Sequence, residues 1–414
     1  MSERRTFGLA LGAMMAVQML TAMLQQSVPV MAPVAAPALG LAKQDVGYYT
    51  ALTFLGANFS AVAGGIMAAR WGAVRTSQVA LGTCGLALVL FGSAWLPLIV
   101  LASWLMGIGY GPATPASSQV LSRLTPPRFA NLVFSIKQTG VPLGYVLAGL
   151  VVPLLVTLWT WQIAAVALGG GCIVLAGALE PLRGRLDVER HGTAPPLGRA
   201  IRGFFDPVVA VWRHPVMRRL ALVSFVFAST QVSVIAFLVV YLEGDLGFSL
   251  VDAGLLLAIG TACGAVGRIA WGLLADATGR PLLVLAGLAV GMTAASLLLA
   301  AAQPGWSFAA VAAVASLAGL VMVGWNGVYF AEIARQSPPG QVATMTGGAT
   351  FFTYSGPLIV PPLFSLLLGW LGSFALNYTI AAAASAAAGL VLWRLHGRGR
   401  PGSPTVTPEG VTPC

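Results

Sequence analysis

The sequence predicts an all-α membrane protein with twelve transmembrane helices in two six-helix, pseudo-symmetric halves. Of the 414 residues, 57% are hydrophobic and only 8% are charged, whereas soluble domains contain about 25% charged residues. Apolar stretches of the roughly 20 residues that cross a bilayer follow one another along the chain. Short sequence echoes also recur at matching places in the two halves, which indicates a duplication.

Apolar runs, read against turn residues and charges, place six spans in each half. The first six are expected at residues 8–33, 46–69, 76–96, 98–121, 131–155 and 160–180. The second six are expected at residues 219–242, 251–274, 281–301, 307–331, 343–368 and 372–394. The opening segment superficially resembles a secretory signal, but its apolar run exceeds the roughly 7–15 residues of a signal core. The repeat also requires this segment as a helix.

These spans divide the chain into a first half (1–180), a linker (181–218), a second half (219–396) and a tail (397–414). The linker combines arginines with acids and prolines, which is typical of a solvated cytoplasmic connection. An alternative is an interfacial helix within it that binds anionic lipid. The tail is rich in Pro, Gly and Thr, and we expect it to be disordered.

Arginines set the predicted orientation, because cytoplasmic loops carry an excess of basic residues. Those on one side of this topology are Arg4, Arg5, Arg70, Arg75, Arg123, Arg128, Arg280, Arg335, Arg394, Arg398 and Arg400. The opposite loops carry Lys43 as their only basic residue. Both termini are therefore expected in the cytoplasm of a bacterium, with the spans in its inner membrane. The net charge of +10 does not indicate nucleic-acid binding, because the basic residues lie in loops between spans.

A glycine-rich turn with a basic residue follows the second span, and a second copy follows the eighth. The marked positions are Gly65, Arg70 and Gly72 in the first copy and Gly272, Asp276, Gly279 and Arg280 in the second. The acid of such a turn can face the positive N-terminal end of a neighbouring helix and hold one conformation. A generic tight turn is the simpler alternative. Because each half has an even number of spans, the two repeats share one orientation.

These turns resemble the signature loop of the major facilitator superfamily, and the resemblance covers all twelve spans. Ala69 replaces the acid in the first copy, whereas the second copy keeps Asp276. The resemblance implies a transporter that works by alternating access. It also implies that spans 1, 4, 7 and 10 line a central cavity, that spans 2, 5, 8 and 11 form the interface between the halves, and that the protein is a monomer.

Two ionisable residues lie well inside predicted spans, where charge is costly and marks functional sites. Lys137 lies about six residues, or roughly 9 Å, into span 5, and Arg268 lies at a similar depth in span 8. The acids all lie at span ends, in loops or in the tail. We therefore expect an anionic substrate, such as a carboxylate, to bind both cations. The alternative is that both side chains snorkel to the headgroups.

Arg268 with Gly272 four residues later resembles the span 8 arginine of monocarboxylate transporters and the oxalate:formate exchanger. In those proteins this arginine binds the substrate carboxylate, which implies the same role here. This chain has Gly264 where the monocarboxylate transporters carry an acid, which argues against proton coupling through that position.

Uncharged polar and aromatic residues in the spans are further candidates for substrate binding, although interhelical hydrogen bonds and packing are the alternative for each. They are Gln25, Gln138, Gln231, Trp325, Asn326 and Tyr354. Glycine and proline pairs in spans 5 and 11 predict kinks that act as hinges. These are Gly140 and Pro142 in span 5 and Gly356 and Pro357 in span 11.

Together these features predict a secondary transporter of a small organic anion, coupled to a proton or a counter-anion. An exporter of amphipathic drugs or metabolites is the alternative, and a membrane sensor without transport is a third. The four cysteines and three histidines have no metal-site spacing, so we expect no metal, no cofactor and no enzymatic activity.

Overall fold

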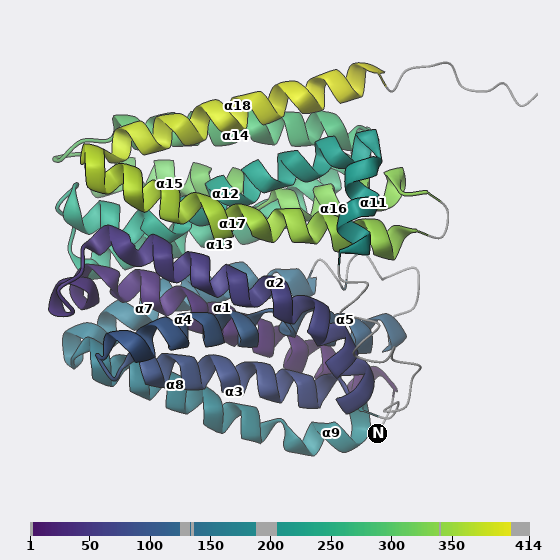
Figure 1. The fold of residues 1–414 in the computed structure, drawn as a ribbon, viewed down its shortest axis with the longest axis horizontal. Helices are drawn as coiled ribbons and strands as arrows, with labels where there is room; N and C mark the ends of the chain where they lie inside the picture. The colour runs from purple at the N-terminus through teal and green to yellow at the C-terminus, as the bar shows by residue number, and fades with distance from the viewer. Residues whose placement is uncertain (1–2, 125–132, 134–135, 188–204, 339–340, 399–414) are drawn as a thin grey trace, which may run out of the picture.

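The structure is a computed structural model that describes residues 3–124, 133, 136–187, 205–338 and 341–398. Within these ranges every secondary-structure element is a helix. Figure 1 shows the long helices side by side, running along the longest axis of the molecule. Most of the tail predicted at 397–414 lies outside the described residues.

Each half contains six spans, and two of the twelve spans are split into two helices. The first half contains α1 (Glu3–Ala38), α2 (Val46–Trp71), α3 (Ala73–Phe91), α4 (Leu96–Tyr110), α5 (Ala113–Leu124), α7 (Gly140–Leu158) and α8 (Trp161–Ala178). The second contains α12 (Pro215–Gly244), α13 (Leu250–Thr278), α14 (Pro281–Ala301), α15 (Phe308–Met322), α16 (Trp325–Gln336), α17 (Val342–Leu371) and α18 (Phe374–Arg398). Shorter elements are η1 (Lys43–Asp45), α9 (Glu180–Leu186) and α11 (Asp206–Arg213).

Eleven helical segments of the described residues are long and apolar enough to cross a membrane. The segment α2 is not among them, but its 26 residues extend about 39 Å at 1.5 Å per residue. It packs against α4 within the first half. Every predicted span therefore coincides with a helix, and the predicted all-α membrane fold is confirmed.

Spans 4 and 10 lie where they were predicted, and a short break divides each of them into two helices. The break between α4 and α5 falls at Gly111 and Pro112, where the missing N–H and the ring of proline disfavour a continuous helix. A Cβ atom on Gly111 would also collide with the hydroxyl of Ser60. At the second break, a Cβ atom on Gly324 would lie 2.5 Å from the ring of Trp271. Both breaks therefore lie where a neighbouring helix approaches closely.

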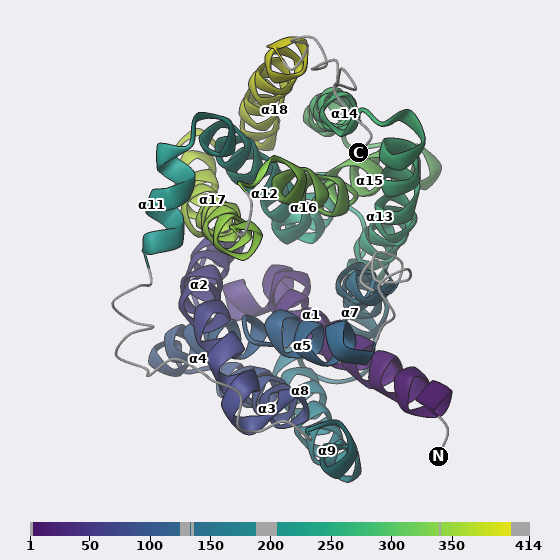
Figure 2. The same cartoon turned by 90° about the vertical axis from the view of Figure 1, so that its right-hand side faces the viewer.

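The two halves meet mainly along two pairs of helices. The segment α2 packs against α17, and α7 packs against α13, with a smaller contact between α1 and α12. These are spans 2, 5, 8 and 11, the interface that the family resemblance implied. Figure 2 shows the first half below and the second half above, with these pairs at the boundary.

Glycines allow the backbones of the two halves to touch. Cβ atoms on Gly149 of α7 and Gly254 of α13 would each collide with the carbonyl oxygen of the other residue. A Cβ atom on Gly47 of α2 would likewise collide with Pro361 and Ser365 of α17. Close backbone approach through small residues is the usual way in which membrane helices associate.

The described parts of the predicted linker are not a plain solvated connection. Figure 1 shows α11 lying across the ends of the longer helices, and it packs on α17. The ring of Trp212 stacks on that of Phe352, with 5.9 Å between their centroids, and Val211 is fully buried. Residues 188–204 of the linker lie outside the described residues.

Candidate functional site

Arg268 joins the two halves through its guanidinium group. The Nη1 atom donates a hydrogen bond to the carbonyl oxygen of Gln138 in the first half, at 2.8 Å. The Nε atom donates to the carbonyl oxygen of Val323 in its own half, at 3.1 Å. Val323 is the C-terminal cap of α15, where the carbonyl groups carry the negative end of the helix dipole. The break in span 10 therefore helps to hold a cation without an acid.

Lys137, the other predicted cation, is buried with only 1% of its surface exposed. Its Nζ atom donates to the carbonyl oxygen of Thr114 at 3.2 Å and to the hydroxyl of Ser118 at 3.1 Å. Both partners belong to α5. A lysine that snorkelled to the headgroups would expose its ammonium group. The buried position of Lys137 therefore differs from the snorkelling alternative.

Lys137 and Arg268 are linked through Gln138. Arg268 donates a hydrogen bond to the carbonyl oxygen of Gln138, which is the residue after Lys137. No ion pair among the described residues involves either of them. The structure thus brings both predicted cations to residues 137–138. It directs Lys137 toward α5 and Arg268 toward the boundary between the halves.

Gln138 lies in a hydrogen-bond network that includes a residue the sequence analysis missed. Gln18 of α1 donates through Nε2 to Oε1 of Gln138 at 2.8 Å and to the hydroxyl of Thr114 at 3.3 Å. The Oε1 atom of Gln18 is buried and has no hydrogen-bond partner among the described residues. Gln18 lies two helical turns before Gln25, and this spacing could have identified it.

The remaining predicted binding residues separate into two environments. Trp325 donates through Nε1 to Oε1 of Gln231 at 2.9 Å, and both are buried inside the second half. Gln25 is buried, and its Oε1 atom has no partner within the described residues. Asn326 and Tyr354 are half-buried, and the Tyr354 ring meets that of Phe54 edge-on across the two halves, with centroids 5.8 Å apart.

The predicted hinge residues lie at close helix contacts. A Cβ atom on Gly140 would lie 3.1 Å from the carbonyl oxygen of Met15 in α1. One on Gly356 would lie 2.5 Å from the carbonyl oxygen of Phe225 in α12. Pro142 is buried in α7, and Pro357 lies inside a helix, α17, that continues past it. Their role as hinges stays a prediction.

One acid lies deeper than expected. Span 10 was predicted to end at residue 331, but α16 continues to Gln336 and includes Glu332. The Glu332 carboxylate is buried and accepts two hydrogen bonds from Arg335, both at 2.7 Å, and one from Gln336 at 2.8 Å. Its oxygens are thus paired within its own helix, and neither Arg268 nor Lys137 contacts them.

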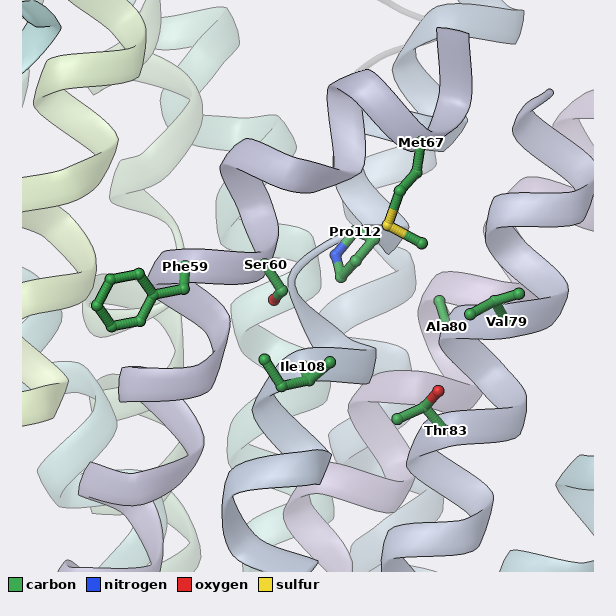
Figure 3. Close-up of a pocket in the computed structure, with 8 residues that line it drawn as sticks. All are labelled: Phe59, Ser60, Met67, Val79, Ala80, Thr83, Ile108 and Pro112. Atoms are coloured by element: carbon green, nitrogen blue, oxygen red, sulfur yellow. The ribbon is translucent and has the colours of Figure 1, made fainter. Parts of the chain in front are cut away.

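A hollow of about 230 Å³ lies elsewhere, on the flank of the first half between α2, α3 and α4. Figure 3 shows Met67, Ile108 and Thr83 around this space, with Phe59 pointing away. Its rim includes the exposed side chains of Phe59 and Val79. The lining is mostly apolar and includes neither Lys137 nor Arg268, so it is not the site described above.

The family model of the Major Facilitator Superfamily matches residues 14–361, which is most of the chain. The chain belongs to this superfamily. It is therefore a multi-pass membrane transporter of the major facilitator type.

Among characterised relatives, this superfamily member is similar to the 3-(3-hydroxy-phenyl)propionate transporter of Escherichia coli. The two are 32% identical over 114 residues, 27% of this chain and 28% of that protein. An uncharacterized MFS-type transporter of Mycobacterium tuberculosis is 27% identical over 202 residues, 48% of this chain and 42% of that protein. The matched segments thus span less than half the length of these relatives.

Solved structures of other transporters share the fold along nearly the whole chain. A POT family transporter in complex with 5-aminolevulinic acid matches with a TM-score of 0.74 at 14% identity, over 94% of this chain and 96% of that one. A bacterial homologue of the human lysosomal transporter Spinster, inward-facing and unoccupied, matches with a TM-score of 0.67 at 16% identity, over 95% and 96% of the two chains. At these identities the likeness concerns the fold alone.

The second copy of the superfamily loop forms the expected tight turn. Gly279 has a φ of +62° and caps α13, in the left-handed region that glycine favours. Asp276 and Arg280 are exposed, and Gly272 lies within the same helix. The described residues provide no hydrogen bond from another helix to the Asp276 carboxylate, so its predicted gating role stays a prediction.

In the first copy a different acid supplies the missing charge. Gly72 turns the chain with a φ of +90°, after Gly65 and the exposed Arg70 in α2. The buried carboxylate of Asp187 accepts hydrogen bonds from the backbone N–H groups of Val74 at 2.8 Å and Arg75 at 3.1 Å. It therefore caps the positive end of α3. Asp187 was missed because it is distant from the loop in sequence.

Proposed function

We propose that this chain is a secondary active transporter that moves a small organic anion, a carboxylate, across the bacterial inner membrane by alternating access. The observation that carries the proposal is the position of Arg268 at the boundary between the halves, where no acidic side chain of the described residues forms an ion pair with it. Arginine has five N–H donors, and two of its nitrogen atoms donate hydrogen bonds to the carbonyl oxygens of Gln138 and Val323. A substrate carboxylate can occupy the others with two parallel hydrogen bonds.

Binding at Arg268 would couple the substrate to the movement of the halves. The guanidinium belongs to α13, and its hydrogen bond across the boundary, among the described residues, goes to a carbonyl oxygen of the first half. A carboxylate competes with this neutral acceptor, because charge-assisted hydrogen bonds are roughly twice as strong as neutral ones. Lys137 lies beside the same segment and supports the negative charge of the substrate from within the first half.

The relative from Escherichia coli supports the same class, because it is a 3-(3-hydroxy-phenyl)propionate transporter and a propionate is a carboxylate. The proposal includes a proton or a counter-anion as the coupling partner and a monomer as the working unit. It also places both termini in the cytoplasm, which rests on the distribution of arginines.

Ligand-induced thermal stabilisation of the purified protein tests the substrate class. The ligands are acetate, butyrate and succinate, a phosphonate, a sulfonate and cationic amphipathic drugs. The variants are Arg268→Ala, Arg268→Lys and Lys137→Ala, with Arg394→Ala as a matched control that removes an exposed cation outside the gating loops.

Carboxylates should stabilise the unaltered protein and Arg394→Ala, and they should not stabilise Arg268→Ala. Arg268→Lys should bind more weakly, because lysine lacks the planar pair of donors. Uptake of the same carboxylate into proteoliposomes should show the same order. Stabilisation by cationic drugs alone, unchanged in both Arg268 variants, would contradict the proposal and favour an exporter of amphipathic compounds.

A further inference from the structure

The helix α11 docks closely on α17, and this contact fixes the direction of its other sides. A Cβ atom on Gly348 of α17 would collide with the carbonyl oxygen of Pro207 and with the side chain of Val211. Val211 is fully buried there. The ring of Phe205, the N-terminal cap of α11, meets that of Phe351 edge-on, with centroids 6.0 Å apart. The side of α11 that carries Pro207 and Val211 is therefore its protein side.

The opposite half of α11 carries an exposed apolar strip. Phe205, Val209 and Trp212 are 57%, 44% and 48% exposed. Because successive helical residues turn by about 100°, these three side chains lie within about 60° of one another, and Val209 points about 160° away from Val211. Two aromatic rings and a valine side by side are costly to expose to water, so the strip marks a contact surface.

The level of α11 along α17 matches the surface of a bilayer. With 30 residues, α17 is about 45 Å long, and a helix of this length centred in a hydrocarbon core of about 30 Å extends about 7 Å beyond it at each end. Gly348 lies six residues, or about 9 Å, after the start of α17. Figure 1 shows α11 lying across the long helices, and Figure 2 shows it beside α17 at the outer edge of the second half. The helix therefore runs along the plane in which headgroups meet acyl chains.

Basic side chains lie next to the apolar strip. The guanidinium carbon of Arg218, in the first turns of α12, lies 5.7 Å from the centroid of the Trp212 ring. Arg213 is exposed and follows Trp212 directly, whereas the acid Asp206 lies at the other end of α11. Tryptophan is enriched where membrane and water meet, and a guanidinium group can bind a phosphate with two parallel hydrogen bonds. This end of α11 thus combines an apolar anchor with donors for phosphate.

We propose that α11 is an interfacial helix that binds anionic phospholipid of the surrounding bilayer. Its apolar strip, formed by Phe205, Val209 and Trp212, enters the boundary between headgroups and acyl chains. Arg213 and Arg218 bind the phosphates of the headgroups. Amphipathic helices with these residue types bury their apolar side about 5–10 Å deep in that boundary, and anionic lipid strengthens their binding. The inference concerns the lipid around the transporter and is independent of the substrate that it carries.

Fluorescence quenching in proteoliposomes tests the contact. A bimane label is attached to full-length protein at Val209→Cys, on the apolar strip, or at Asp206→Cys, the matched control on the charged side of the same helix. The four native cysteines are replaced by alanine, and the buried Cys84 and Cys172 are kept if their replacement prevents folding. The vesicles contain two parts phosphatidylcholine and one part phosphatidylglycerol. The quenchers are brominated phosphatidylcholine, brominated phosphatidylglycerol and water-soluble acrylamide.

We expect both brominated lipids to quench the label at position 209 more strongly than the label at position 206, and acrylamide to show the reverse order. Brominated phosphatidylglycerol should quench the label at position 209 more than brominated phosphatidylcholine does. Arg218→Gln should lower this ratio about fivefold, because one arginine near an anionic surface accounts for a factor of that size. Arg394→Gln, which removes an exposed cation of α18, should leave the ratio unchanged.

Three results would overturn the proposal. Strong acrylamide quenching at both positions would show that α11 lies in water. Equal quenching by the two brominated lipids, unaffected by Arg218→Gln, would show lipid contact without a preference for anionic headgroups. Protection of the label at position 209 from all three quenchers would show that protein, such as a second copy of this chain, covers the strip.

Discussion

The ion pair between Lys43 and Glu243 joins the two halves at one end of the transporter. The effect of breaking this pair would show how strongly it stabilises the closed state of that end. Lys43 lies in η1 of the first half and Glu243 near the end of α12 in the second. Their Nζ and Oε2 atoms are 2.5 Å apart, and the side chains are 34% and 29% exposed. Ser365 of α17 closes the same end by donating to the carbonyl oxygen of Gln44 at 2.6 Å.

The magnitude follows from the exposure of the pair. Exposed ion pairs contribute about 0.2–1 kcal/mol after screening by water, and a pair that is one-third exposed belongs at the upper end of that range. About 1 kcal/mol corresponds to roughly a fivefold change in an equilibrium constant. Lys43→Gln should therefore raise the ratio of open to closed molecules at this end about fivefold, and the contact made by Ser365 should keep the change from being larger.

Distances between spin labels on the ends of α2 and α17 measure this ratio. The double variant Lys43→Glu with Glu243→Lys should restore the closed population, and high salt should reduce the difference between Lys43→Gln and the unaltered protein. Arg394→Gln serves as a control, because it removes an exposed cation that lies in α18 rather than at η1. An unchanged ratio in Lys43→Gln, or no recovery in the charge swap, would refute the reasoning.

Three further predictions concern stability, measured as the Tm of the purified protein. Burial raises the pKa of Asp245, against the opposing effect of Lys43, and stability from a raised pKa is lost as pH rises through the folded value. Asp245→Asn should therefore raise the Tm at neutral pH and have little effect well below pH 4. An equal effect on the Tm at both pH values would count against this. Gly254→Ala should lose about 1–3 kcal/mol, because its Cβ atom would collide with the first half, whereas Gly171→Ala, with open space around it, should change little. Asp187→Ala should cost about 1–2 kcal/mol by uncapping α3, and Asp187→Asn should recover part of this; a neutral Asp187→Ala would show that the cap is dispensable.

The fold was predictable because its signals are local. Each apolar run is long enough to cross a bilayer, and the repeated turn at Gly72 and Gly279 identifies the duplication. The breaks in spans 4 and 10 were not predictable with the same ease. Pro112 is a visible signal, but Gly324 resembles many other membrane glycines. Its break depends on the approach of Trp271 from another helix, which is a tertiary contact.

The site was predictable only in part, for the same reason. Buried charge is rare in a membrane helix, so Lys137 and Arg268 stand out in the sequence. Their partners do not, because Val323 and Gln138 accept with backbone carbonyl groups that every residue carries. Gln18 was missed because an uncharged polar residue in a membrane span usually indicates an interhelical hydrogen bond.

The cap that Asp187 places on α3 determines where the first half can be cut from the second. Residues after span 6 are tied back to the first half through this carboxylate, while α11 is packed on α17 of the second half. A pair of co-expressed fragments should therefore be divided between residues 188 and 204 rather than at residue 180. A division at 180 would leave the first fragment with an uncapped helix and give the second fragment a buried acid without its partner.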